Sequence, residues 1–206
     1  MFTGLIEATG RIGRIDAARE GRVLRIETPL GAELRAGESI AVSGVCLTAT
    51  HSDAGGFSAE VSPETMRVTS LGSVVEGELV NLERPIRADG RLGGHFVLGH
   101  VDGVGRIAVL RPDGDCYWLD VEYPAALAAF LVSKGSVAVD GISLTIAALQ
   151  NGRFGVQIVP FTWAHTTLQT KRAGDPVNLE TDIIGKYVAR LAREPGPDLW
   201  DTHSKT

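Results

Sequence analysis

The 206-residue chain is poor in cysteine, in clustered positive charge and in long apolar runs. Its two cysteines, Cys46 and Cys116, are too few for a disulfide framework and predict reduced thiols in the cytoplasm. A net charge of −5 without a basic stripe gives no reason to expect nucleic acid or an anionic membrane as a partner. No segment reaches the length of a membrane span, and no cationic leader precedes the first apolar residues, so we expect the mature chain to begin at Met1.

Motifs for phosphate and metal binding are also missing. No P-loop occurs, and the glycine-rich stretch at 99–105 lacks the spacing of a dinucleotide-binding turn. His95 and His100 are five residues apart, which matches no standard zinc arrangement. The sequence therefore predicts no metal site.

An internal repeat organises the sequence. The heptapeptide VSGVCLT at 42–48 returns as VDGISLT at 139–145. A shift of 97 residues aligns 37–86 with 134–183 without a gap, and 18 of those 50 positions are identical. Since about three identities are expected by chance, the chain contains a duplicated unit.

Short strands separated by glycine and polar turns dominate the repeat. In the first copy, β-branched or alternating apolar segments lie at 2–7, 9–16, 22–28, 38–43, 45–51, 57–62 and 78–84. This spacing predicts closed antiparallel barrels. A proline directly after a strand predicts a short helical turn at Pro63 and again at Pro160, and we expect further helices at 124–133 and 29–36.

The repeat length favours two domains. Together with the strand pattern, it predicts an all-β chain of two homologous barrels in tandem. A polar, glycine-rich link at 87–94 sets the boundary between an N-terminal domain at 1–89 and a C-terminal domain at 90–182.

The last segment has no counterpart in the first copy. Ile184, Tyr187, Val188 and Leu191 recur at helical spacing, which predicts an amphipathic helix over 183–195 that ends at Pro195. A helix outside both barrels must bury its apolar side, either by folding back on its own domain or by packing against neighbouring subunits, and we expect self-association. Residues 196–206 are polar and predict a flexible tail.

Several positions align between the two copies but carry chemically different side chains. The pairs are Cys46 with Ser143, Leu5 with His100, Gly37 with Lys134, Ser43 with Asp140, and Pro85 with Asp182. The second copy has gained ionisable groups around the shared motif. For any single one of these differences, surface drift is the better explanation, and several differences around one motif shift that balance only modestly, because burial and proximity are not visible in the sequence.

Five segments resemble riboflavin synthases of the alpha-chain type, and the resemblance spans residues 1 to about 190. They are MFTGLIE at the start, GVCLT at 44–48, SPETMRVTSLG at 62–72, GGHFVLGH at 93–100 and KGSVAVDGISLT at 134–145. The resemblance implies two six-stranded Greek-key barrels and a C-terminal helix that assembles a homotrimer. It also implies four-carbon-unit transfer between two molecules of 6,7-dimethyl-8-ribityllumazine, without a cofactor, and an association with lumazine synthase.

The resemblance implies substrate contacts from both copies, at the subunit boundary. Around the first lumazine we expect Gly4, Leu5, Ile6, Cys46, Leu47, Thr48, Glu60, Val61, Ser62, Pro63, Glu64 and Thr65. Around the second we expect Gly99, His100, Val101, Lys134, Ser143, Leu144, Thr145, Val159, Pro160, Phe161, Thr162, Trp163 and Ala164. Phe161 departs from the family, in which many relatives carry a polar residue.

Six of the polar residues are candidates for catalysis. Cys46, Ser39 and Thr48 are expected near the reacting carbons, and Cys46 is a candidate nucleophile. His100 and Asp182 are expected to handle protons, and Ser143 to assist them. The general base is left open.

Two other functions stay open. A lumazine- or flavin-binding protein of the same family would keep the barrels without the catalysis. A reductase-type FAD barrel would carry an Arg-x-Tyr-Ser/Thr motif, whereas residues 67–70 here read RVTS, and a second barrel follows instead of a nucleotide-binding domain.

Overall fold

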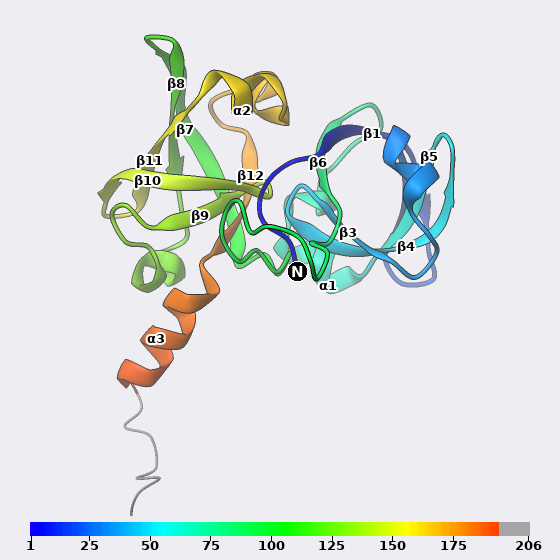
Figure 1. The fold of residues 1–206 in the computed structure, drawn as a ribbon, viewed down its shortest axis with the longest axis horizontal. Coiled ribbons are helices and arrows are strands. Elements are labelled where there is room, and N and C mark those ends of the chain that lie inside the picture. The colour runs from blue at the N-terminus through cyan, green and yellow to red at the C-terminus, as the bar shows by residue number, and fades with distance from the viewer. Residues whose placement is uncertain (194–206) are drawn as a thin grey trace, which may run out of the picture.

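The computed structural model describes residues 1–193 and contains two closed six-stranded antiparallel barrels that lie side by side (Figure 1). The first barrel consists of β1 (Ala8–Ala17), β2 (Arg22–Glu27), β3 (Ser39–Val42), β4 (Val45–Asp53), β5 (Gly56–Val61) and β6 (Leu79–Glu83). The second consists of β7 (Gly103–Asp113), β8 (Cys116–Glu122), β9 (Ser136–Val139), β10 (Ile142–Gln150), β11 (Arg153–Ile158) and β12 (Pro176–Thr181). The expected fold class is confirmed.

Both barrels have the same strand order. The first reads β1-β2-β5-β4-β3-β6, and the second gives the same circle when its strands are renumbered from β7. The run β2-β5-β4-β3 is a Greek key, because three hairpin-connected strands lie beside the strand that precedes them. The predicted domain boundary at 89/90 falls in the connection between β6 and β7.

Each barrel has its own apolar core, because inward and outward side chains alternate along the strands. On β4, Val45, Leu47 and Ala49 are buried, whereas Cys46 and Thr48 lie on the outer face. Phe57 and Phe154 occupy equivalent positions in the two cores. Full burial of one such side chain stabilises the fold by about 1.5–3 kcal/mol.

The two barrels meet at their shared motif. The β3–β4 turn at Ser43–Gly44 and the β9–β10 turn at Asp140–Gly141 have positive φ at both residues, as type I′ turns require. The turns touch so closely that a Cβ on Gly44 would lie 2.6 Å from the Gly141 nitrogen.

A buried asparagine from each barrel crosses this contact. The Asn81 amide donates to the Asp140 carbonyl at 3.0 Å and accepts from the Thr167 N–H at 2.8 Å. Asn178 makes the equivalent bonds, to the Ser43 carbonyl at 2.9 Å and from the Ser70 N–H at 2.7 Å. These asparagines belong to the segment VNLE, which occurs at 80–83 and again at 177–180, so this repeated segment holds the barrels together.

Short helices follow the strands. They are η1 (Pro29–Glu33), α1 (Pro63–Val68), η2 (Ser70–Gly72), η3 (Ala125–Phe130), α2 (Pro160–Ala164), η4 (Thr167–Thr170) and α3 (Ile183–Arg193). The helical turns predicted at Pro63 and Pro160 are confirmed. The helices expected at 29–36 and 124–133 are shorter 3-10 turns, and η3 has no side-chain cap at its start. The expected strand at 2–7 is wrong: it contributes a single bridge between Phe2 and Val97.

Helix α3 projects away from the second barrel (Figure 1). It confirms the predicted amphipathic helix up to Arg193, while its expected end at Pro195 and the expected tail lie outside the described residues. Within residues 1–193, no helix is both long and apolar enough to cross a membrane.

Candidate functional site

The expected catalytic residues of the first copy share the outer face of one hairpin. Ser39 pairs with Thr48 across β3 and β4, and Ala41 pairs with Cys46 two residues along. Directly paired residues point to the same side of a sheet, so Ser39, Cys46 and Thr48 form one outward-facing row.

The second barrel repeats this row with altered chemistry. Ser136 pairs with Thr145, and Ala138 pairs with Ser143, which stands where the first barrel has Cys46. The two rows give the chain two similar surfaces, one with a thiol and one with a hydroxyl.

Two segments cross from one barrel to the other beside these rows. The Ser143 N–H donates to the Gly4 carbonyl at 2.8 Å, and the Cys46 N–H donates to the Gly99 carbonyl at 2.9 Å. A Cβ on Gly4 would lie 2.6 Å from the Ser143 Cβ, and one on Gly99 would lie 2.5 Å from the Cys46 Cβ. Glycine is required at both positions, where φ is also positive.

This crossing corrects the expected grouping of the site residues. The segment Gly4–Ile6 was expected beside Cys46, and Gly99–Val101 beside Ser143. In the structure, Ile6 packs against the core of the second barrel and Val101 against the core of the first. Each surface is therefore completed by a segment from the other half of the repeat.

Two buried glutamates hold the crossing segments in place. The Glu83 carboxylate accepts the Thr3 N–H at 2.6 Å and the Gly4 N–H at 2.9 Å, and Glu180 accepts the Leu98 N–H at 2.7 Å and the Gly99 N–H at 2.9 Å. Burial raises the pKa of both carboxyl groups, against the opposing effect of these hydrogen bonds. Neither glutamate was among the expected site residues, although both end the repeated VNLE segment, which was a signal in the sequence.

A histidine absent from the expected site lies against Ser143. His95 Nδ1 is 2.7 Å from Ser143 Oγ, and the side chain of His95 is only 7% exposed. Burial lowers the pKa of His95, and the charge of Asp182 partly opposes this effect. His95 is therefore neutral at neutral pH.

The remaining polar candidates lie toward the surface. His100 and Lys134 are exposed, and Lys134 adopts a left-handed conformation with φ 66°. Asp182 accepts the Ile184 N–H at 3.0 Å and so caps the start of α3. His100 adjoins the first-barrel row through Gly99, whereas Asp182 acts electrostatically on His95, so the two expected proton-handling residues flank different rows.

The segments after β5 and β11 differ between the barrels. In the first, Ser62 caps α1 through the Thr65 N–H at 3.1 Å, and Glu64 pairs with Arg67 at 2.6 Å. In the second, Phe161 is 72% exposed and stacks on His165.

Trp163, also in α2, stacks on Tyr117 with ring centroids 3.6 Å apart. Cys116 precedes this tyrosine and is half-buried and unpaired. The second surface is thus bordered by aromatic rings where the first has an ion pair.

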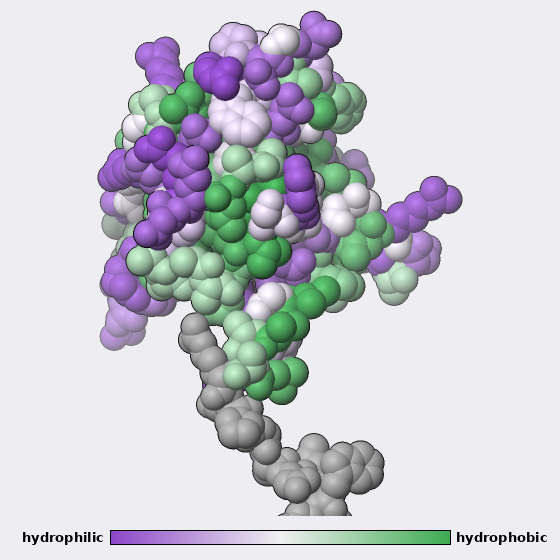
Figure 2. Space-filling model, turned by 90° about the vertical axis from the view of Figure 1, so that its left-hand side faces the viewer, coloured by the Kyte–Doolittle hydropathy of each residue, from purple (hydrophilic) through white to green (hydrophobic). Residues whose placement is uncertain are grey.

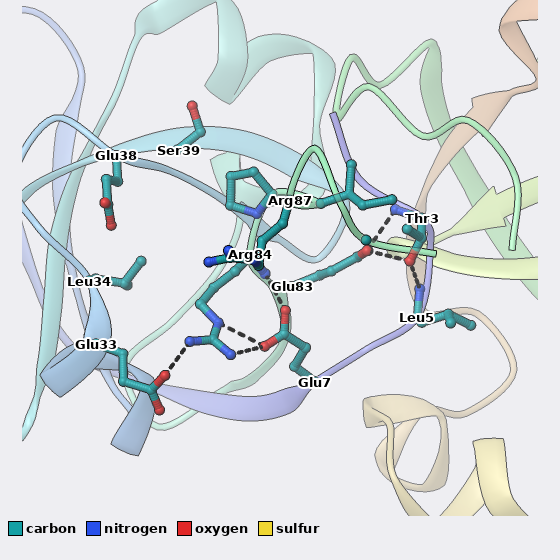
Figure 3. Close-up of a pocket in the computed structure, with 13 residues that line it drawn as sticks. Thr3, Leu5, Glu7, Glu33, Leu34, Glu38, Ser39, Glu83, Arg84 and Arg87 are labelled. Atoms are coloured by element: carbon teal, nitrogen blue, oxygen red, sulfur yellow. Dashed lines mark hydrogen bonds and ion pairs between the residues drawn. The ribbon is translucent and has the colours of Figure 1, made fainter. Parts of the chain in front are cut away.

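A pocket of about 820 Å³ lies beside the first row (Figure 3). It contains Ser39 and Leu5 of the expected site, and Arg84 spans it between Glu7 and Glu33. Glu7 also accepts the Arg84 N–H at 3.0 Å.

At the equivalent place in the second barrel lies the start of α3. Asp102, the counterpart of Glu7, accepts the Thr181 N–H at 2.8 Å and pairs with Lys186 of α3 at 2.7 Å. The pocket therefore exists in the first barrel because no helix follows β6.

Comparisons with known proteins agree on one family. The model of the lumazine binding domain matches residues 3–85 and 98–182. Riboflavin synthase from Actinobacillus pleuropneumoniae is 42% identical over 96% of this chain and 93% of its own length. The riboflavin synthases of Bacillus subtilis and Mycobacterium tuberculosis are 41% and 44% identical, over 93% and 95% of this chain and 89% and 100% of their own lengths.

Solved structures share the fold at lower identity. The crystal structure of LumP complexed with riboflavin superposes with a TM-score of 0.82, at 21% identity, over 88% of this chain and 99% of that chain. LumP complexed with 6,7-dimethyl-8-(1'-D-ribityl) lumazine gives a TM-score of 0.80, also at 21% identity, over the same shares of the two chains.

Proposed function

Since the chain belongs to the riboflavin synthase family, we propose that it transfers a four-carbon unit between two molecules of 6,7-dimethyl-8-ribityllumazine. The products are riboflavin and 5-amino-6-ribitylamino-2,4(1H,3H)-pyrimidinedione. The observation that carries this proposal is the duplicated outer row, because a reaction between two identical molecules needs two similar surfaces.

The reaction also needs the two surfaces to differ. One lumazine loses a proton from its 7-methyl group and the other accepts a nucleophile at its electron-poor ring. Contact between the two bound rings makes the step effectively intramolecular, which contributes up to about 7–11 kcal/mol. The two rows differ at one equivalent position, where the first carries Cys46 and the second carries Ser143.

We assign the first lumazine to the row of Cys46 and Thr48 with residues 60–65, completed by residues 99–101. The second belongs to Ser143 and Thr145 with Lys134 and residues 159–164, completed by residues 4–6. This assignment follows the crossing segments and replaces the grouping expected from the sequence.

Among the proposed catalytic residues, Cys46 has the most direct test. If its thiol is the nucleophile, Cys46→Ser lowers kcat by at least 100-fold while lumazine still binds. Cys116→Ser is the matched control, since Cys116 is also half-buried and unpaired. Equal turnover in both variants contradicts the nucleophile role. Ser39 and Thr48 remain proposed near the reacting carbons. His100 and Asp182 remain proposed to handle protons, with Ser143 assisting them.

We further propose a homotrimer in which active sites form between subunits. Support comes from α3, whose Ile184, Tyr187, Val188 and Leu191 are 54%, 67%, 60% and 73% exposed. Figure 2 shows apolar side chains on the helix below the second barrel. An exposed apolar stripe of this kind is characteristic of an assembly surface.

Sedimentation velocity tests the assembly. Leu191→Glu is expected to yield monomers without activity, whereas Arg190→Gln, on the polar side of the helix, keeps the trimer. A monomeric wild-type protein contradicts the proposal.

The proposal extends to a cytoplasmic location, supported by the two unpaired cysteines, and to an association with lumazine synthase, which co-sedimentation of the two proteins tests.

A conversion assay tests the function itself. Incubation of the protein with the lumazine is expected to produce riboflavin absorbance, and calorimetry should find two lumazine molecules bound per chain. A lumazine- or flavin-binding protein without catalysis would bind the ligand and leave it unchanged. That second candidate is not favoured, because relatives at 41–44% identity over nearly the whole chain are riboflavin synthases.

A further inference from the structure

The backbone at Gly94 and His95 brings the imidazole to Ser143. Its N–H donates to the Thr3 carbonyl at 3.1 Å, which fixes the backbone. A Cβ on the preceding Gly94 would lie 2.1 Å from that carbonyl and 3.0 Å from Ser143 Oγ, so only glycine lets the histidine approach. The imidazole is then held 2.7 Å from the hydroxyl.

The surroundings of His95 select one tautomer. Its Nε2 is buried and has no hydrogen-bond partner among residues 1–193. A buried N–H without an acceptor is rarer and costlier than a buried lone pair. The proton of the neutral ring therefore resides on Nδ1, and Nδ1–H donates to Ser143 Oγ.

This bond decides what Ser143 can offer to a ligand. With one lone pair of Oγ occupied by Nδ1–H, the hydroxyl hydrogen is free to point toward the outer row. The first barrel has no such arrangement, because Cys46 occupies the equivalent position and a thiol is a weak donor. The two surfaces differ in their ability to donate a hydrogen bond.

We propose that His95 is a positioning residue that directs the Ser143 hydroxyl toward the lumazine bound at the second barrel, and that this molecule is the one deprotonated at its 7-methyl group. The inference rests on the proposed function. In the step, the C–H bond breaks, hydroxide takes the proton to form water, and the electron pair spreads into the ring. Ser143 keeps its proton and donates a hydrogen bond to the resulting negative charge.

Exchange of the 7-methyl protons with D2O, followed by proton NMR, isolates this step from turnover. His95→Asn keeps an N–H near the Nδ1 position, while His95→Gln places its amide near Nε2 instead. We expect His95→Gln to slow protein-dependent exchange by about 10- to 100-fold, which is the effect of losing one hydrogen bond to a charged group. His95→Asn is expected to stay within about threefold of wild type, with the Kd for lumazine little changed in both variants.

His51→Asn is the matched control, since His51 is exposed on β4, where its Nε2 lies 3.5 Å from Asp53 Oδ2. Its exchange rate should equal that of the wild type. Equal exchange in His95→Gln and wild type overturns the inference, and so does an equal loss in His95→Gln and His95→Asn at matched stability in urea. If the wild type neither makes riboflavin nor exchanges the protons, the proposed function itself has failed.

Discussion

The contact between the two type I′ turns makes Gly44 sensitive even to a small substitution. Its φ is +78°, and a Cβ there would lie 2.6 Å from the Gly141 nitrogen and 3.0 Å from the Gly141 Cα. Both obstacles are backbone atoms and cannot rotate away. Gly44→Ala must therefore push the barrels apart where Asn81 and Asn178 cross between them.

The expected loss combines two costs. Alanine in the left-handed region costs about 1–2 kcal/mol, and overpacking against a fixed neighbour costs about 1–3 kcal/mol. The free energy of unfolding should thus fall by about 2–5 kcal/mol. Gly37 provides the control: its φ is +91°, but a Cβ there meets nothing within 4 Å. Gly37→Ala should cost only the first part, about 1–2 kcal/mol.

Urea unfolding of both variants and the wild type measures the difference. Protein concentration must be equal in all samples, because assembly contributes to apparent stability. We expect Gly44→Ala to be less stable than Gly37→Ala by about 1–3 kcal/mol. If both variants lose the same free energy within about 0.5 kcal/mol, the two turns are not in tight contact, and the account of the inter-barrel junction is wrong.

Three further predictions concern buried polar groups. Asn81→Ala leaves the Thr167 N–H and the Asp140 carbonyl without partners, so urea midpoints should report a loss of about 2–4 kcal/mol. Burial raises the pKa of Glu180 above its ordinary 4.5, so the folded state holds this proton to higher pH than the unfolded state does. The free energy of unfolding of the wild type should therefore fall as the pH rises from the unfolded pKa through the folded pKa. Unfolding curves taken across this pH range should show a flatter dependence for Glu180→Gln. Burial raises the pKa of Asp140, and the charge of Lys171, 3.4 Å away, opposes this effect. Lys171→Met should therefore lower the free energy of unfolding by about 3–5 kcal/mol at neutral pH, and by far less where Asp140 is protonated in both the folded and the unfolded state. A pH-independent loss would contradict the ion pair.

Local patterns in the sequence determined the duplication, the barrels and the last helix. Alternation on β4 and β10 and the proline that begins each helical turn act within a few residues, so they are readable without a structure. The alignment of the two copies placed Cys46 and Ser143 at matching positions. The repeated segment VNLE was evident in the sequence, but nothing there showed that its asparagines bond to the other barrel.

Only the tertiary structure decided how the two halves share their surfaces. Glu83 and Glu180 take the backbone N–H groups of the crossing segments, so these segments cannot join a strand of their own barrel and their carbonyls pair with the other barrel instead. His95 meets Ser143 across 48 residues for the same reason. Such contacts depend on which buried group satisfies which backbone atom, and that balance is settled only when the whole chain is packed.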